Sequence, residues 1–155
     1  DRGHRRDGQP RGGGVSGRTR ADAVGNLVHW AATGERTPMY SSPEQRNADI
    51  DAGSRRPASE LVDWFERSAT ALRDGWAGLD EVAWAREVVT AQGRTVAASE
   101  TPWMRSREVM IHAVDLDTGL SLADLPADFL LALGDDIVAK RAASGGPAPT
   151  LPPWL

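Results

Sequence analysis

Apolar residues recur at helical spacing in four separate stretches of the chain, at residues 21–33, 57–76, 101–119 and 127–143. This spacing places the apolar side chains along one side of an α-helix. Glycine and proline residues stand between the stretches, at positions where helices end. Four helices of such length, joined by connections of unequal length, predict an all-α fold of the four-helix bundle class.

Two of the connections are predicted to contain structure of their own. Residues 34–56 include two prolines among polar residues, so we expect a long first connection with a short helix over 44–52, closed by Gly53. Ser54 is the predicted N-cap of the long helix that follows. β-Branched residues flank the Gln-Gly pair at 92–93 and predict a small hairpin or irregular segment before the third long helix.

The two ends of the chain differ from this central part. Residues 1–20 hold six arginines, six glycines and a single aliphatic residue, so we expect no core element there. Residues 144–155 are rich in glycine and proline, which is typical of a linker, and we expect it to lead toward an absent C-terminal domain. The predicted helical domain therefore covers residues 21–143.

The composition argues against several classes of function. The 155 residues carry 18 Lys and Arg against 22 Asp and Glu, a net charge of −4, so we expect no nucleic-acid partner. No apolar run approaches the roughly 20 residues that cross a bilayer, so we expect no membrane contact and a cytoplasmic location. The chain has no cysteine, so any thiol chemistry would need an imported thiol.

One pair of residues on the third predicted helix could carry chemistry. Glu108 and His112 are four positions apart, so both project from one helix face. They could chelate one divalent cation, for which zinc is the natural candidate, or they could form an ordinary hydrogen-bonded pair. Arg105 and Arg107 flank Glu108, and we expect one of them to attract an anionic thiol or substrate. Asp115, near the helix end, could accept a hydrogen bond from a group beside the metal site, but we expect solvation.

The residues around this pair resemble a known family. The segment WMRSREVMIHAVDLD, residues 103–117, is similar to the signature R-x-x-E-V/W-x-I/V-H-x-V-D-L of the mycothiol-dependent maleylpyruvate isomerases, a branch of the DinB-like metal-binding bundles. Residues 21–61 resemble the N-terminal segment of that family, including its T-G-E-x-T-P-M-Y loop and the R-x-x-D-I that follows. Because two separated motifs occur in the same order, the resemblance extends over residues 21–143 and implies a DinB-like four-helix bundle.

The resemblance implies a zinc site and a substrate-binding cation. In the family, zinc is held by a histidine of the first helix and by the glutamate and histidine of the third, with a position open for thiol or water. Glu108 and His112 match the last two ligands, whereas Ser16 occupies the position of the first. Arg46 matches the arginine that the family uses on the substrate carboxylates. Arg105 is the second candidate for substrate binding.

The resemblance further implies an isomerase that converts maleylpyruvate to fumarylpyruvate in gentisate degradation, with zinc and mycothiol as cofactors. Its partners would be a small-molecule substrate and a low-molecular-weight thiol. Zinc would lower the pKa of the thiol, and the thiolate would add to the cis double bond, allow rotation and leave from the trans product.

The serine at the first ligand position predicts weak zinc binding, and hence an inactive copy of the enzyme. We also expect a truncated copy, because the C-terminal domain that contributes to the active site in the family is absent. We further hypothesise that residues 1–20 are not the native start of this domain, because the resemblance stops at residue 21. Two other functions stay open from the sequence. One is a different thiol S-transferase of the DinB superfamily, and the other is a non-catalytic helical binding bundle.

Overall fold

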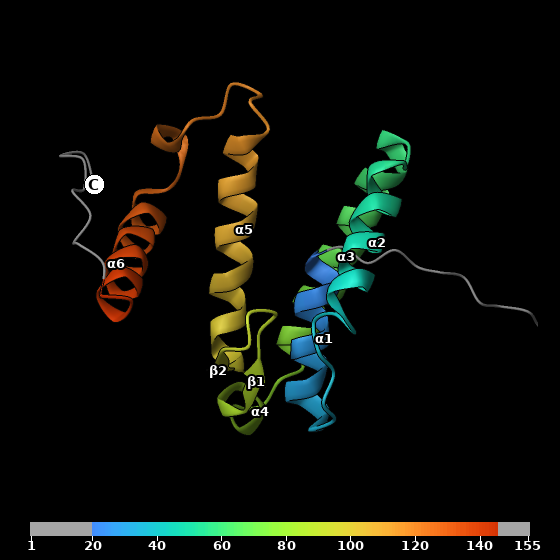
Figure 1. Ribbon diagram of the computed structural model, residues 1–155, viewed down its shortest axis with the longest axis vertical. Coiled ribbons are helices and arrows are strands. Elements are labelled where there is room, and N and C mark those ends of the chain that lie inside the picture. The colour runs from blue at the N-terminus through green and yellow to red at the C-terminus, as the bar shows by residue number, and fades with distance from the viewer. Residues whose placement is uncertain (1–19, 146–155) are drawn as a thin grey trace, which may run out of the picture. The chain divides into compact units, whose positions relative to one another are not determined.

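The computed structural model describes residues 20–145, with side chains from residue 23 onward, so Ser16 lies outside the described residues. Within that part the chain is mainly helical, which confirms the all-α class (Figure 1). In chain order its elements are α1 (Arg20–Thr33), α2 (Pro43–Ser54), α3 (Ala58–Ala77), α4 (Glu81–Ala85), β1 (Glu87–Val89), β2 (Thr95–Ala97), the 3-10 turn η1 (Ala98–Glu100), α5 (Thr101–Asp115), the 3-10 turn η2 (Leu122–Asp124) and α6 (Ala127–Ala143). The chain divides into two compact units, Asp1–Val96 and Ala97–Leu155.

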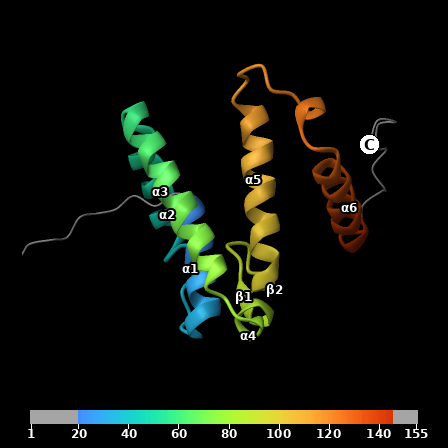
Figure 2. The same ribbon diagram turned by 180° about the vertical axis from the view of Figure 1, so that it is seen from behind.

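The core of the first unit lies between α1 and α3, which pack along each other (Figures 1 and 2). The helical spacing of the α1 sequence gathers its small and aliphatic side chains on this face, and the buried ones are Ala23, Val24, Leu27, Val28 and Ala31. Gly75 of α3 permits the close approach, since a Cβ atom there would lie 3.2 Å from Cγ1 of Val28.

The end of α1 agrees with the sequence prediction. Gly34 follows the helix in the left-handed region, with φ at +79°, and its N–H donates to the carbonyl of Trp30 at 2.8 Å. A glycine adopts this conformation at little cost, so it ends helices in this way. The guanidinium of Arg86 donates to the carbonyl of Ala31, one of the acceptors left without a helical partner in the last turn.

The short helix of the first connection, α2, is longer than the predicted 44–52. Ser42 is its N-cap, and the hydroxyl oxygen of that serine accepts a hydrogen bond from the N–H of Gln45 at 3.1 Å. Pro43 takes the first helical position, where its missing N–H costs nothing. Gly53, predicted to close the helix, lies inside it, because the helix continues to Ser54.

The predicted N-cap of α3 is wrong. Ser54 belongs to α2, and its hydroxyl donates to the carbonyl of Asp51 at 2.8 Å. The helix α3 begins after Pro57 without a side-chain cap. A proline at this point keeps the preceding chain extended and has no N–H of its own to satisfy.

A short helix that the sequence analysis missed, α4, precedes the hairpin. Asp80 caps it, accepting a hydrogen bond from the N–H of Ala83 at 2.7 Å. The predicted hairpin is confirmed as the two-stranded sheet of β1 and β2. Its turn is closed by a hydrogen bond from the N–H of Thr90 to the carbonyl of Arg94 at 2.9 Å, and Gly93 supplies the left-handed residue with φ at +78°.

In the second unit, α6 packs on α5 through one aromatic contact and one charged cluster. The rings of Trp103 and Phe129 are tilted by 47° with centroids 5.5 Å apart. Asp136 of α6 accepts hydrogen bonds from Arg107 of α5 and from Lys140, one turn further along α6, each at 2.6 Å. These contacts join α5 to α6.

The third long helix ends earlier than predicted. The helix α5 stops at Asp115, four residues before the Gly119 that was expected to end it. Asp117 follows with φ at +50°, a left-handed conformation that aspartate tolerates better than most residues. Among the residues that the structure describes, no helix combines the length and apolar character needed to span a bilayer.

Candidate functional site

Glu108 and His112 lie one turn apart on α5, in its regular helical part, so both side chains leave the same face of the helix. The Glu108 side chain is mostly buried, at 23% exposure. Nη1 of Arg105 lies 3.9 Å from Oε2 of Glu108, and the Arg105 side chain is only 15% exposed. The structure thus places a carboxylate, an imidazole and a guanidinium on two successive turns of one helix.

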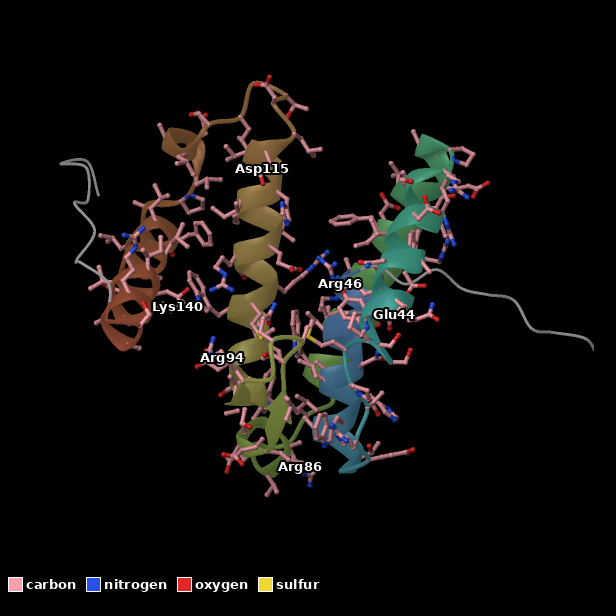
Figure 3. All side chains as sticks on the ribbon, viewed as in Figure 1. Glu44, Arg46, Arg86, Arg94, Asp115 and Lys140 are labelled. Atoms are coloured by element: carbon pink, nitrogen blue, oxygen red, sulfur yellow. The ribbon has the colours of Figure 1, made fainter. Side chains whose placement is uncertain are left out.

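Asp115 contacts the imidazole of His112. The two residues are three positions apart, and Nδ1 of His112 lies 3.0 Å from Oδ2 of Asp115 in the last turn of α5 (Figure 3). An ionised carboxylate only accepts hydrogen bonds, so in a neutral ring this contact favours the tautomer that carries its proton on Nδ1. The sequence favoured solvation for Asp115; its side chain is indeed exposed, and it also contacts the candidate metal ligand.

Glu108 and His112 on α5 have the donor atoms expected of two of the ligands in a zinc site. They comprise one carboxylate and one imidazole nitrogen whose other nitrogen is already held by a carboxylate, which is the usual arrangement around a metal-bound histidine. No group of three or more His, Cys, Asp or Glu residues that could hold a metal is present in the part of the chain that the structure describes. Glu108 and His112 therefore offer two ligands, and the position of the predicted third, Ser16, lies outside that part.

Arg46 belongs to the first unit and stands in the first turn of α2 (Figure 3). Its guanidinium carbon lies 5.9 Å from the centroid of the Tyr40 ring, within the range of a cation–π contact. Its Nη1 lies 3.4 Å from Oδ1 of Asn47, at the long end of the hydrogen-bond range. The side chain thus lies against the T-P-M-Y loop that precedes α2.

Arg46 lines a cavity of about 420 Å³. The walls come from Trp30 of α1, from the loop and helix start at residues 36–46, and from residues 89–92 at the end of β1 and in the hairpin turn. Arg36 is the second cation of the lining, which contains no aspartate or glutamate. The electrostatic character of this cavity is therefore positive, although the whole chain carries a net charge of −4.

Side-chain contacts hold the loop in this position. The Nδ2 atom of Asn26 on α1 donates to the carbonyls of Pro38 and Met39, at 3.1 and 3.3 Å. Met39 is buried, and its sulfur accepts a hydrogen bond from the N–H of Ala91 at 3.2 Å. One loop is thereby tied to both α1 and the hairpin, which makes the cavity a pre-formed feature of the first unit.

The structure places three of the predicted residues on one helix and the fourth in the other unit. Arg105, Glu108 and His112 share α5 in the second unit, whereas Arg46 lies in the first. For Asp115 a hydrogen bond was the less favoured of two expectations, although the H-x-x-D spacing on a helix is a signal for it. Arg36 was not predicted from the sequence, and it occupies the variable position of the T-G-E-x-T-P-M-Y loop.

Comparison with known proteins places this arrangement in a family. Residues 18–117 match the family described as the mycothiol maleylpyruvate isomerase N-terminal domain. The chain is similar to the crystal structure of a mycothiol-dependent maleylpyruvate isomerase, at 49% identity and a TM-score of 0.77, over 83% of this chain and 53% of that chain. A histidine-to-alanine mutant of such an isomerase matches with the same values.

This chain therefore spans about half the length of the solved chains that it matches. A search of curated proteins gave no significant match. The family match covers well over half of the chain and agrees with the motifs around Glu108 and Arg46. The chain thus belongs to the mycothiol maleylpyruvate isomerase N-terminal domain family.

Proposed function

We propose that this chain is the metal-binding domain of a mycothiol-dependent maleylpyruvate isomerase that acts in the cytoplasm. The observation that supports this most is the 49% identity to such an isomerase over 83% of the chain. The family match, residues 18–117, includes Glu108 and His112. The reaction would change the cis double bond of maleylpyruvate to the trans double bond of fumarylpyruvate.

Zinc is the metal that we propose for Glu108 and His112. A carboxylate oxygen and an imidazole nitrogen are ligands that zinc accepts, and the contact between His112 and Asp115 is of the kind that orients a metal-bound histidine. When bound, zinc would lower the pKa of a coordinated thiol and so supply thiolate near neutral pH. The chain contains no cysteine, which agrees with a thiol brought by mycothiol.

Arg46 is the residue that we propose for the substrate. The thiolate sulfur would form a bond to one carbon of the double bond, and the electron pair would move into the neighbouring carbonyl as an enolate. Rotation about the resulting single bond and loss of the thiolate would then give the trans isomer. A guanidinium can hold a carboxylate with two parallel hydrogen bonds and can stabilise the negative charge of the enolate.

Arg105 has a different position from Arg46. Its guanidinium lies 3.9 Å from the Glu108 carboxylate and is mostly buried, so it forms a long ion pair with a candidate metal ligand. Substrate binding by Arg105 remains a prediction. If an anionic thiol or substrate approaches Glu108, Arg105 is the cation on α5 that already lies beside it.

The first prediction concerns zinc, with Ser16→His as the decisive variant. The unaltered chain offers two of the three expected ligands, so we expect it to hold zinc weakly after purification. Because a third ligand closes more of the coordination sphere, Ser16→His should raise zinc affinity by about tenfold or more. Metal analysis and a competition titration with a chelator measure both proteins, and Ser16→Ala serves as the matched control.

Turnover is then measured on the zinc-loaded Ser16→His protein with maleylpyruvate and mycothiol, with each omitted in turn. Isomerisation that requires both supports the proposal. Equal, stoichiometric zinc in the unaltered chain and in Ser16→His would refute the predicted ligand deficit. Transfer of mycothiol to other electrophiles without isomerisation would instead identify a thiol S-transferase.

A further inference from the structure

The cavity beside Arg46 has the size and rigidity of a small-molecule site. Its volume of about 420 Å³ falls within the range of about 300–1,000 Å³ that is usual for such sites. The hydrogen bonds from Asn26 to the loop and from Ala91 to Met39 fix two of its walls without a ligand. A site that is already formed loses little conformational freedom on binding.

The lining offers two kinds of contact. Trp30 and Tyr40 contribute aromatic rings, and such rings pack well on the C–H face of a saturated ring. Arg36 and Gln92 contribute several hydrogen-bond donors, and the serine and threonine hydroxyls of the lining can both donate and accept. Aromatic faces next to many neutral polar groups suit a ligand with hydroxylated rings.

Size and charge together narrow the choice of ligand. A small dicarboxylate would engage the two arginines and fill only part of the volume. A ligand built from two hydroxylated rings would use the aromatic walls and the neutral polar groups as well. Arg46 would remain in the wall of the same cavity, so the rings of that ligand would lie beside the cation that we assign to the substrate.

We propose that this cavity binds the hydroxylated ring part of the thiol cofactor. This inference depends on the proposed function, because mycothiol is an N-acetylcysteine joined to a glucosamine and an inositol ring. Trp30 and Tyr40 would stack on the rings, and Arg36 and Gln92 would donate hydrogen bonds to their hydroxyls. The cysteine part is not needed for these contacts.

The test uses a probe that lacks the thiol. N-Acetylglucosaminyl-inositol is titrated against the whole chain in the presence of a chelator, and binding is followed by saturation-transfer NMR and calorimetry. We expect saturable binding that N-acetylcysteine does not displace. Because each lost hydrogen bond to the ligand weakens binding appreciably, Arg36→Ala and Gln92→Ala should each raise Kd by about tenfold.

The matched control is Arg94→Ala, since Arg94 lies in the same hairpin, is exposed and does not line the cavity. Circular dichroism verifies that all three variants fold. Absence of saturable binding, or equal weakening by Arg94→Ala and Arg36→Ala, would overturn the proposal. Maleate is a second probe, and if maleate binds in an Arg36-dependent manner while the ring probe does not, the cavity is a carboxylate site and the proposal is wrong.

These outcomes are independent of the isomerase assay. If the zinc-loaded protein isomerises maleylpyruvate with mycothiol but the ring probe does not bind, the cavity assignment fails and the proposed function stands. If the ring probe binds with the expected dependence on Arg36 and Gln92 but Ser16→His holds no more zinc than Ser16→Ala, cofactor binding in the cavity stands and the proposed metal-binding function fails.

Discussion

At the scale of single residues, the hydrogen bond between Asp115 and His112 has the clearest chemical consequence. A metal-bound histidine needs the lone pair of one ring nitrogen, and a carboxylate on the other nitrogen secures it. Asp115 is 61% exposed and His112 56% exposed, so the contact is not forced by burial. It follows from helix geometry, which brings side chains three positions apart onto one face.

The second prediction is that Asp115→Asn weakens the preference of His112 for one tautomer. Asparagine keeps the size of the side chain and loses the charge, so the preference of His112 for a proton on Nδ1 should decrease. Nitrogen NMR of the metal-free chain reads the tautomer directly. In the Ser16→His background, zinc affinity should fall by about tenfold or more, as is typical when the partner of a metal-bound histidine is changed.

Asp117→Asn is the control for this measurement, because Asp117 lies two residues further along the same helix end and has a left-handed backbone that asparagine also adopts. It should leave both the tautomer and the zinc affinity unchanged. An unchanged His112 tautomer in Asp115→Asn would show that Asp115 does not position the ring.

At the scale of elements, the two helices of the α1–α3 contact each contain a glycine, and the two glycines have different surroundings. Gly25 lies inside α1, and a Cβ atom there would meet nothing within 4 Å. A Cβ atom at Gly75 would lie 3.2 Å from Cγ1 of Val28, which is a tight contact. The two positions therefore separate the effect of helix propensity from that of packing.

The third prediction uses this difference. Gly25→Ala should raise the free energy of unfolding by roughly 0.5–1 kcal/mol, because alanine loses less conformational freedom in a helix than glycine. Gly75→Val should lower it by about 1–3 kcal/mol, since the larger side chain overpacks the contact with Val28. Urea unfolding followed by circular dichroism measures both. A Gly25→Ala protein no more stable than the parent would contradict this account.

Some of the secondary-structure elements could be predicted from sequence patterns, and others could not. The helical period and the final glycine predicted α1 and its end at Gly34, because both depend on local chemistry. The helix α4 escaped detection, since its five residues are too few to display a period, although Asp80 was a usable N-cap signal. Gly53 was misjudged because a glycine can remain inside a helix when neighbouring residues continue it.

At the scale of the whole molecule, the candidate site was only partly predictable. The Glu108 and His112 pair depends on spacing within one helix, so the sequence located it. The cavity depends on contacts between distant segments, with Trp30 and the T-P-M-Y loop on one side and the hairpin turn on the other. No local sequence pattern shows that Asn26 and Met39 join these segments. The cavity could therefore be found only from the structure.

Charged side chains also affect the stability of the whole molecule, because the stability depends on pH. Among the described residues, the pKa values of Glu44, Asp124 and Asp136 are lowered in the folded state. Burial on its own raises the pKa of Asp136, but the hydrogen bonds and charges of Lys140 and Arg107 outweigh it. Exposed Glu44 and Asp124 are held by hydrogen bonds at the starts of α2 and η2.

The fourth prediction is the resulting pH dependence of stability. A carboxylate whose pKa is lower in the folded than in the unfolded chain contributes stability that is complete above the ordinary pKa, 3.8 for Asp136. That contribution is lost as the pH falls through the lowered value. Thermal unfolding should therefore show Tm constant near neutral pH and decreasing as the pH drops below about 4.

Asp136→Asn should reduce this decrease and lower Tm at neutral pH, because the neutral side chain no longer attracts Arg107 and Lys140 and the contact between α5 and α6 weakens. Asp135→Asn is the matched control on the same helix, where the side chain is exposed. It should leave the acid profile close to that of the parent chain. If both variants follow the parent profile, the Asp136 cluster does not stabilise the second unit, and the acid response originates at the helix starts occupied by Glu44 and Asp124.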